Sequence, residues 1–314
     1  GCYNYHMKAI QIKSFGGPEV LEMVENVQAP NLGENQILVE VHTASINPFD
    51  LYVLGGKAGG KLPLVLGGDF AGVVKEVSDG VSQFSVGDEV YGQALVQNGG
   101  SGSFAQIAAS NVKNTGVKPK NINFEEAASL PLVGASAIQA IVDSIKLASN
   151  QKILIHGGAG GIGSIAIQLA KAIGAYVYTT VSADDIDFVK SLGADEAIDY
   201  KKEKFEEKVK DVDGVFDTVG GETTNKSFTV LKKGGVLVSM VGVSNPELAE
   251  KYNVTAIPQF TKTTTDRLNR LRDYLEEGKV KPQVDKVFPI QQARDAFDYM
   301  IKASPRGKVV IKIK

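Results

Sequence analysis

The chain has 314 residues, a formal net charge of −2, 43% hydrophobic residues and 22% charged residues. This is the composition of a globular protein that buries most of its surface without disulfides or a structural metal. One cysteine, Cys2, is present, which excludes a disulfide framework and a cysteine-ligated zinc site. The balanced charge gives no footprint for nucleic acid or an anionic membrane, so we expect a small-molecule partner.

Two segments need to be set aside before the fold is considered. Residues 1–6 precede Met7 and resemble an expression remnant, which would also remove Cys2 from the native chain. Residues 153–170 carry no charged side chain and reach the length of a membrane span. The glycines clustered in that segment instead indicate a tight turn before a helix. We therefore expect a cytoplasmic protein without a membrane segment.

The N-terminal part predicts a β-rich module that ends near residue 122. Its strands alternate apolar and polar residues with period two. We expect them at 8–12, 36–41, 72–77 and 104–108.

From residue 123 the pattern changes to alternating helices and strands, which is typical of βαβ units and a parallel sheet. We expect nearly all-apolar strands at 152–155, 176–181, 214–217 and 236–241. Apolar residues at helical spacing predict a helix over 162–173 that stops at Gly174. A further helix is expected over 265–277, and a last strand at 307–313 is expected to pair back into the N-terminal module.

The predicted fold class is therefore α/β, with a doubly wound parallel sheet inserted into a discontinuous β-rich domain. We expect the β-rich domain to comprise 7–122 and 278–314, and the doubly wound domain 123–277. A cleft between two such domains is where a ligand is expected.

The strongest motif is the glycine-rich turn between the predicted strand 152–155 and helix 162–173. Gly158, Gly160 and Gly163 form G-x-G-x-x-G in the strand–turn–helix context of a Rossmann dinucleotide-binding domain. Without Cβ atoms, the backbone can approach a pyrophosphate at the positive end of a helix. The alternative is a turn needed only for packing. The intervening Ala159, Gly161 and Ile162 are expected to contribute to the same cofactor site.

The residue after the second parallel strand indicates which dinucleotide is bound. An acidic side chain there favours NAD, whereas this chain has Ser182, which leaves room for a 2′-phosphate. NADPH is therefore favoured and NADH remains possible. The alternative for Ser182 is an N-cap of a helix over 184–192.

Several short segments along the chain follow one another in a characteristic order: 44–50, 67–74, 86–92, 127–131, 157–163, 192–195, 217–221 and 307–310. In these segments and their order, the chain resembles medium-chain dehydrogenases/reductases of the quinone oxidoreductase (zeta-crystallin-like) branch. The resemblance implies a GroES-like N-terminal domain and covers the chain from Met7 onward. Zinc-dependent relatives have a cysteine at the position of Asn47 and a His-Glu pair at 68–69, so a zinc-free enzyme is expected here.

The resemblance also implies the site residues. Asn47 and Tyr52 are expected to donate hydrogen bonds to a substrate carbonyl as charge develops on its oxygen. Asp50 is the third expected catalytic residue. The alternative roles are an N-cap for Asn47, a capping-box acceptor for Asp50 and a half-buried amphipathic side chain for Tyr52. Lys308 is expected to reach the cofactor phosphates or to be a solvated edge-strand lysine. The other cofactor contacts that the resemblance implies are Ser136, Tyr200, Val219, Gly220, Val241 and Gly242.

The function implied is hydride transfer from NADPH to a quinone or to the β-carbon of an α,β-unsaturated carbonyl such as a 2-alkenal. The alternatives are an NADPH-binding structural or interaction protein, a zinc-free alcohol dehydrogenase and an enoyl-thioester reductase. Residues 254–260 resemble the edge strand through which relatives dimerise, so a homodimer is expected.

Overall fold

The structure is a computed structural model that describes residues 5–314; Cys2 and the rest of 1–4 lie outside the described residues. The chain forms two compact units, which we call the β-rich unit and the α/β unit. The β-rich unit contains the residues up to 132 together with 263–276 and 282–314. The α/β unit contains residues 133–262 and 277–281.

Within the described residues, the β-rich unit contains two sheets and four α-helices. Its larger sheet has the order β15-β16-β3-β5-β6-β8, with β7 also paired to β3, and its smaller sheet has the order β2-β1-β4. The strands are β1 (His6–Ile12), β2 (Glu22–Gln28), β3 (Gln36–Ser45), β4 (Leu64–Val65), β5 (Asp69–Val77), β6 (Glu89–Gln93), β7 (Ile107–Asn111), β8 (Thr115–Val117), β15 (Val284–Pro289) and β16 (Lys308–Lys312). The helices are α1 (Pro48–Leu54), α2 (Phe124–Ala128), α9 (Thr265–Glu276) and α10 (Ala293–Ala303).

Period-two alternation explains the core of the larger sheet. Ile37, Val39 and Val41 of β3 point to one face and pack with Phe70 of β5 in a single hydrophobic cluster. The C-terminal strand β16 pairs antiparallel with β3, which confirms that the chain returns to the N-terminal module.

The α/β unit is a six-stranded parallel sheet of order β11-β10-β9-β12-β13-β14, a doubly wound Rossmann arrangement. Its strands are β9 (Lys152–His156), β10 (Tyr176–Val181), β11 (Glu196–Asp199), β12 (Val212–Asp217), β13 (Leu231–Ser239) and β14 (Thr255–Pro258). Its helices are α3 (Pro131–Ala137), which continues as a π-helical stretch (Ile138–Ser144), α4 (Gly161–Ile173), α5 (Ile186–Ser191), α6 (Phe205–Lys208), α7 (Glu222–Ser227) and α8 (Glu247–Tyr252).

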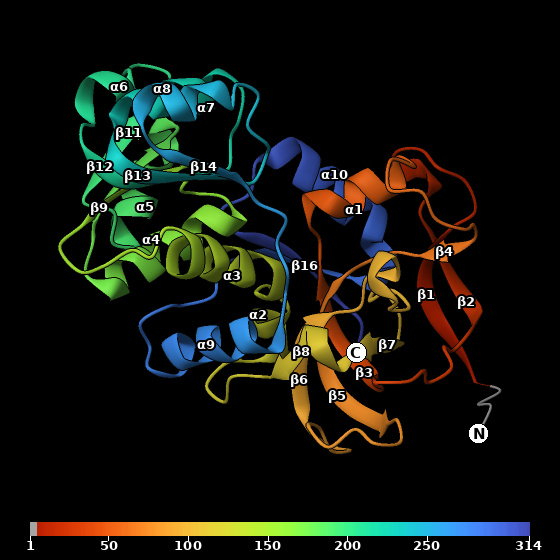
Figure 1. The fold of residues 1–314 in the computed structure, drawn as a ribbon. Coiled ribbons are helices and arrows are strands. Elements are labelled where there is room, and N and C mark those ends of the chain that lie inside the picture. Colours follow the sequence, from red (N-terminus) through yellow and green to blue (C-terminus); the bar gives the residue numbers. More distant parts are fainter. Residues whose placement is uncertain (1–4) are drawn as a thin grey trace. The chain divides into compact units, whose positions relative to one another are not determined.

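Helices cover both faces of this sheet. Figure 1 shows α4 and α5 below the strands and α6, α7 and α8 above them. Helix α4 buries its apolar stripe and ends at Gly174 in the left-handed conformation (φ 101°), as the sequence predicted. Because α4 follows the carboxyl end of β9, the start of α4 lies at the carboxyl edge of the sheet, where ligands bind in doubly wound folds.

The unit boundaries differ from the sequence prediction because two helices join the β-rich unit. Helix α2 packs on β3 and β5, and the ring of Phe124 lies 4.1 Å from that of His42. Helix α9 packs on β8, and the Tyr91 hydroxyl donates to Leu268 O at 2.5 Å. Residues 277–281 instead join the α/β unit, where Gln168 Nε2 donates to Lys281 O at 3.0 Å.

Two strands are displaced from their predicted ranges. Residues 104–106 do not belong to β7, because Phe104 N donates to Leu66 O and Ile10 N donates to Phe104 O. The other strand, β13, starts at Leu231 and ends at Ser239, so Val241 belongs to the loop that follows it. The start of this strand does not follow the apolar pattern, because residues 232–235 are two lysines followed by two glycines.

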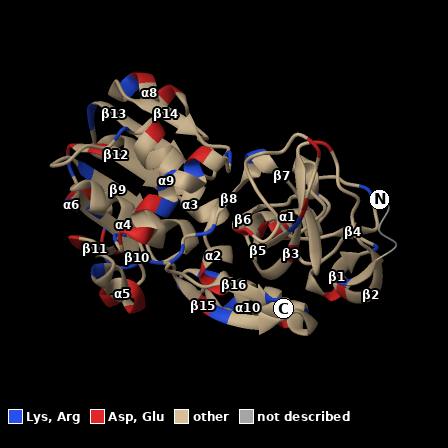
Figure 2. Cartoon of the chain, turned by 90° about the horizontal axis from the view of Figure 1, so that it is seen from below, with Lys and Arg blue, Asp and Glu red and all other residues tan. Residues whose placement is uncertain are grey.

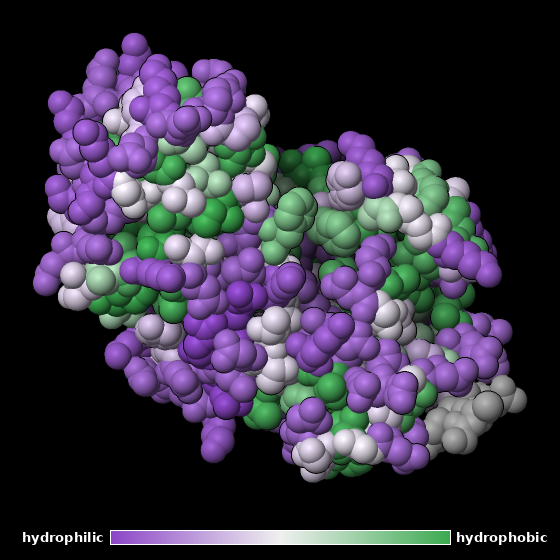
Figure 3. Space-filling view, viewed as in Figure 1, coloured by the Kyte–Doolittle hydropathy of each residue, from purple (hydrophilic) through white to green (hydrophobic). Residues whose placement is uncertain are grey.

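The surface mixes charges of both signs. Figure 2 shows lysine, arginine, aspartate and glutamate interspersed along the helices, and Figure 3 shows a mainly hydrophilic face with separated apolar areas. Within residues 5–314, no helix combines the length and the apolar character needed to cross a bilayer.

His156 on β9 is a packing residue. It is fully buried, and its ring nitrogens lie 2.9 Å from Thr180 Oγ1 and 2.8 Å from Ser227 Oγ. Burial lowers the pKa of His156 to about 4, against the opposing charge of Asp217.

The lowered pKa makes the stability pH-dependent. As the pH falls from about 6.5 towards 4, the unfolded chain gains a proton at His156 that the folded chain does not accept. We expect this residue to lower the free energy of unfolding by up to ~1.4 kcal/mol per pH unit in that window. In urea unfolding between pH 6.5 and 5, the free energy of unfolding should change less steeply with pH in His156→Gln than in the wild type. The exposed His6→Gln serves as control, and equal slopes in His156→Gln and the wild type would contradict the assignment.

Candidate active site

The glycine-rich turn joins β9 to α4. Gly157 has φ +74°, a conformation that favours glycine, and Gly160 is the N-cap of α4. The first N–H groups of any helix have no carbonyl partner within that helix. Gly161, Ile162 and Gly163 therefore present their amides at the positive end of α4, directly after Ala159 and Gly160.

The glycines of the motif differ in what a Cβ atom would meet. At Gly158 it would lie 2.1 Å from Thr179 Oγ1, and at Gly163 it would lie 2.1 Å from Gly157 O. Those two glycines are required by packing within the protein. At Gly160 the nearest atom would be Gly157 O at 3.5 Å, and its φ of −75° suits any residue. The protein itself therefore does not require glycine at position 160, whereas a pyrophosphate approaching the helix start would.

Ser182 and Tyr200 lie side by side at the same edge of the sheet. They follow β10 and β11, whose last residues Val181 and Asp199 are paired. Tyr200 is 58% exposed, and Lys201 Nζ lies 5.8 Å from the centroid of its ring. Ser182 is the N-cap of the next helical turn, but its hydroxyl donates to Asp185 Oδ2 at 3.3 Å and does not accept from a backbone amide.

Two exposed valines follow the ends of β12 and β13. Val219 and Val241 are each 54% exposed. The turn at Val219 is fixed by the buried Asp217, whose Oδ1 accepts from Val219 N at 2.8 Å and from Gly220 N at 3.1 Å. A Cβ on Gly220 would lie 2.7 Å from Val241 Cγ2, so the two loops are in contact. Gly242 (φ +90°) follows Val241, and together these residues form an apolar ledge.

Ser136 lies in a buried polar cluster that the sequence analysis missed. Its Oγ is 2.7 Å from Thr261 Oγ1, and its carbonyl accepts from Gln259 Nε2 at 3.1 Å. Gln259 Oε1 is a buried acceptor that has no hydrogen-bond partner among the described residues. The available signal was that Gln259 is a polar residue directly after a strand; similarly, Asp217 is a polar residue at the end of β12.

In the β-rich unit, Asn47 and Asp50 occupy the capping-box positions of α1, as in the alternatives given above, and Pro48 is at N1. Asp50 Oδ2 accepts from Asn47 N at 2.7 Å. No side-chain cap hydrogen bond comes from Asn47. Its Oδ1 instead accepts from the ammonium of Lys308, which also donates to Ile46 O.

This arrangement contradicts one prediction for Lys308. Strand β16 lies between β15 and β3 and is not an edge strand. The Lys308 side chain is buried, with 6% of the residue exposed, so it is not a solvated lysine. Contact with cofactor phosphates stays a prediction.

A second carboxylate, Asp69, completes the buried network. Its oxygens accept from Gln93 Nε2 at 2.8 Å, from Leu132 N at 3.2 Å and from Ser45 Oγ at 3.5 Å. The Asn47 side chain also donates to Asp69. Because the groups around Asp69 are donors, its negative charge is stabilised without solvent.

Burial dominates the protonation of the three ionisable groups in this network. It raises the pKa of Asp50 to about 7 and raises the pKa of Asp69, while Lys308 opposes both shifts. Burial also lowers the pKa of Lys308, and the two carboxylates oppose that shift. Two carboxylates therefore share one ammonium, and burial favours the protonated form of both carboxyl groups.

Known proteins share these motifs. Residues 33–135 match the alcohol dehydrogenase GroES-like domain family, and residues 192–311 match the zinc-binding dehydrogenase family. The chain is 38% identical to the chloroplastic NADPH-dependent alkenal/one oxidoreductase of Arabidopsis thaliana, over 97% of this chain and 79% of that protein. This chain belongs to the quinone oxidoreductase family of medium-chain dehydrogenases/reductases.

Solved structures of the family agree with the fold. The quinone oxidoreductase from Coxiella burnetii aligns with a TM-score of 0.90 and 33% identity, over 99% of this chain and 100% of that one. The Escherichia coli quinone oxidoreductase complexed with NADPH aligns with a TM-score of 0.86 and 28% identity, over 98% and 100%. The protein is an NAD(P)H-dependent oxidoreductase, and the open space at Gly160 fits a cofactor pyrophosphate.

Tyr52 of this oxidoreductase lies apart from the buried network. It is 49% exposed and stacks on Phe49, with the ring centroids 6.1 Å apart. Lys57 Nζ lies 5.8 Å from its ring centroid. The structure therefore brings Asn47, Asp50 and Lys308 together and leaves Tyr52 on the surface of the same helix.

The absence of zinc stays a prediction for this family member. Within the described residues 5–314, no group of three or more His, Cys, Asp or Glu side chains is arranged to hold a metal ion. At two positions where zinc-dependent relatives have zinc ligands, this chain has Asn47 and Asp69, and both lie in the buried network.

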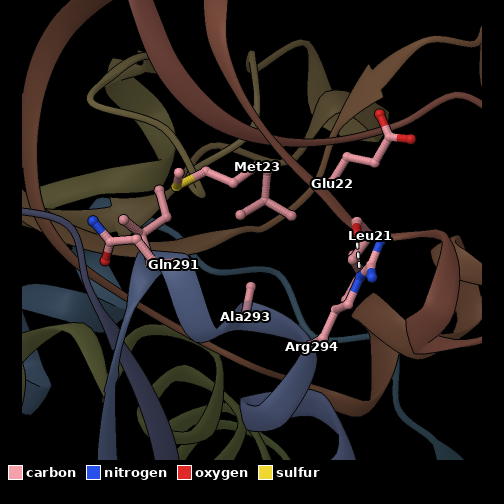
Figure 4. Close-up of a pocket in the computed structure, with 8 residues that line it drawn as sticks. Leu21, Glu22, Met23, Gln291, Ala293 and Arg294 are labelled. Atoms are coloured by element: carbon pink, nitrogen blue, oxygen red, sulfur yellow. Dashed lines mark hydrogen bonds between the residues drawn. The ribbon is translucent and has the colours of Figure 1, made fainter.

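A separate cavity of about 370 Å³ lies in the β-rich unit of the oxidoreductase (Figure 4). Leu21, Glu22 and Met23 line one side, and Ala293 and Arg294 line the other. Arg294 Nε donates to Leu21 O at 2.7 Å across it. The cavity does not include Asn47 or the buried network.

Proposed function

We propose that this enzyme uses NADPH to reduce α,β-unsaturated carbonyls and quinones without zinc. The observation that carries the proposal is the glycine at position 160 of the glycine-rich turn. Packing within the protein does not explain a glycine there, whereas a pyrophosphate close to the backbone does. The acceptor class is supported by the relatives, one of which is named an alkenal/one oxidoreductase and two of which are quinone oxidoreductases.

The cofactor, when bound, supplies the hydride, and the protein supplies binding and electrostatics. The α4 amides hold the pyrophosphate, and the ledge of Val219 and Val241 supports the nicotinamide half by apolar contact. Ser136 completes the proposed cofactor contacts of the α/β unit, and Ser182 with Tyr200 accommodates the 2′-phosphate.

The Asn47 side-chain amide donates to the carbonyl oxygen of the substrate. When hydride adds to the β-carbon, the C=C electrons move towards that oxygen, and an amide donor stabilises the resulting enolate. Water then delivers a proton to the α-carbon, which balances the two-electron reduction. Tyr52 supplies a second donor from the same helix, and Asp50 fixes the start of that helix through Asn47 N.

The enzyme is proposed to act as a cytoplasmic homodimer. Strand β14 is an edge strand of the α/β sheet, and Phe260, just beyond it, is 86% exposed. Such an open edge with an apolar residue beside it supports pairing with a second copy.

An acceptor panel tests the proposal. NADPH oxidation is measured with a 2-alkenal, 1,4-benzoquinone and a saturated aldehyde, after dialysis against a chelator. We expect turnover of the alkenal or the quinone and little turnover of the saturated aldehyde. Tight NADPH binding without any turnover would favour a binding protein, and reduction of the saturated aldehyde alone would favour an alcohol dehydrogenase.

Cofactor choice can be shifted at Ser182. Ser182→Asp places a carboxylate beside the proposed 2′-phosphate and near the ribose hydroxyls. We expect the ratio of the NADPH to the NADH dissociation constant to rise by about 100-fold, because like charges in contact cost several kcal/mol. Fluorescence titration of both cofactors measures it. The control Ser191→Asp adds the same charge on α5, and an unchanged ratio in Ser182→Asp would contradict the assignment.

A further inference from the structure

The side chain of Asn47 is held in an unusual way for a helix N-cap. Lys308 Nζ donates to Asn47 Oδ1 and to Ile46 O, so the ammonium connects β16 to the start of α1. Asn47 is 3% exposed and Lys308 is 6% exposed. A hydrogen bond from a buried ammonium is stronger than one between neutral groups, so it fixes the amide firmly.

The second capping box of the same unit, at α2, is the comparison for Asn47. At α2, Asn123 Oδ1 accepts from Glu126 N at 2.8 Å, and Glu126 Oε1 accepts from Asn123 N at 3.1 Å. At α1, Asp50 Oδ2 accepts from Asn47 N at 2.7 Å, and Asn47 Oδ1 accepts from the Lys308 ammonium. The Asn47 side chain therefore differs from that of Asn123 in being held by a buried ammonium.

The chemistry of the two groups sets the orientation of the amide. An ammonium only donates, so it selects the carbonyl end of the Asn47 side chain and leaves the NH₂ end on the opposite side. That NH₂ group donates to Asp69 and has a second N–H for another acceptor. A substrate oxygen that gains negative charge needs this N–H end, because the carbonyl end would repel it.

We propose that Lys308 is a positioning residue that locks the Asn47 amide with its NH₂ group towards the substrate oxygen. The proposal rests on the function proposed above, in which Asn47 donates to the substrate. It assigns to Lys308 a role through Asn47, in place of a contact with the cofactor phosphates.

The charges around Lys308 make this role dependent on pH. Asp69 on β5 and Asp50 on α1 are the charged groups that face it. Because burial lowers the pKa of Lys308, the ammonium is lost at a lower pH than for a solvated lysine. A neutral amine can accept as well as donate, so it no longer selects one end of the amide.

The test compares Lys308→Met and Lys308→Arg with Lys312→Met, an exposed lysine on the same strand. For Lys308→Met we expect kcat with a 2-alkenal to fall by about 10- to 100-fold and the NADPH dissociation constant to stay within about 2-fold. The alkaline fall in wild-type kcat should disappear in Lys308→Met and move to higher pH in Lys308→Arg, because a guanidinium keeps its charge. A purely structural role would not remove the alkaline limb.

A readout without cofactor complements the kinetics. The Asn47 side-chain NH₂ signal in the ¹⁵N spectrum, assigned by its loss in Asn47→Asp, should move in Lys308→Met and stay in Lys312→Met. If Lys308→Met does not fold, the double variant Lys308→Met/Asp69→Asn removes the buried charge pair together and takes its place.

The outcomes separate this inference from the proposed function. If Asn47→Ala keeps wild-type kcat, the proposed role of Asn47 fails. If Asn47→Ala loses activity while Lys308→Met keeps wild-type kcat and its alkaline limb, only the positioning role fails. A Lys308→Met variant with unchanged kcat and a much larger NADPH dissociation constant would overturn it in favour of a phosphate contact.

Discussion

Gly160→Val weakens NADPH binding by about 100-fold, because its side chain fills the space that the pyrophosphate needs and removes contacts worth about 2–3 kcal/mol. The protein itself tolerates a Cβ at this position, where the nearest atom is 3.5 Å away. Because valine is a poorer N-cap residue than glycine, we expect a loss of about 1 kcal/mol of stability, less than the loss in binding free energy. Fluorescence titration and thermal unfolding of the same sample measure both effects.

Two other glycines give matched comparisons. Gly55→Ala adds a Cβ that is also 3.5 Å from a backbone oxygen, but at the end of α1, and should leave NADPH binding unchanged. Gly163→Ala places a Cβ 2.1 Å from Gly157 O and should lower the stability itself. If Gly160→Val bound NADPH as the wild type does, the pyrophosphate could not lie at this turn.

Asn47→Ala should lower kcat for a 2-alkenal by about 100- to 1,000-fold, the usual effect of removing one donor to a developing oxyanion. The NADPH dissociation constant should not change, since Asn47 is not among the proposed cofactor contacts. Stopped-flow measurement of a single turnover with saturating NADPH isolates the hydride-transfer step.

Asn123→Ala is the control for this change. Asn123 caps α2 with a complete capping box, so its loss should cost about 1 kcal/mol of stability and leave kcat unchanged. If both variants lost activity in proportion to lost stability, Asn47 would be a structural residue only.

Local signals were enough to predict the elements that carry the site. An N-cap at Asn47 and a capping-box acceptor at Asp50 predicted the start of α1, and the apolar stripe predicted α4 as far as Gly174. Strand β10 was predicted to the residue, because a β-branched apolar run between turn residues has few other interpretations.

The long-range contacts could not be predicted from local patterns. Lys308 meets Asn47 only because β16 returns to pair with β3, 261 residues later in the sequence. The same applies to α9, whose amphipathic pattern does not say which unit it covers, and to the buried Gln259, whose partners are Ser136 and Thr261.

The most direct test of the central claim follows the label from deuterated NADPH into a 2-alkenal. The enzyme is incubated with NADPH that carries deuterium at either face of C4, and the product is examined by NMR. We expect deuterium at the β-carbon of a saturated aldehyde, with the carbonyl retained. Deuterium at the carbonyl carbon of an allylic alcohol, or no transfer from either labelled form, would contradict the assignment.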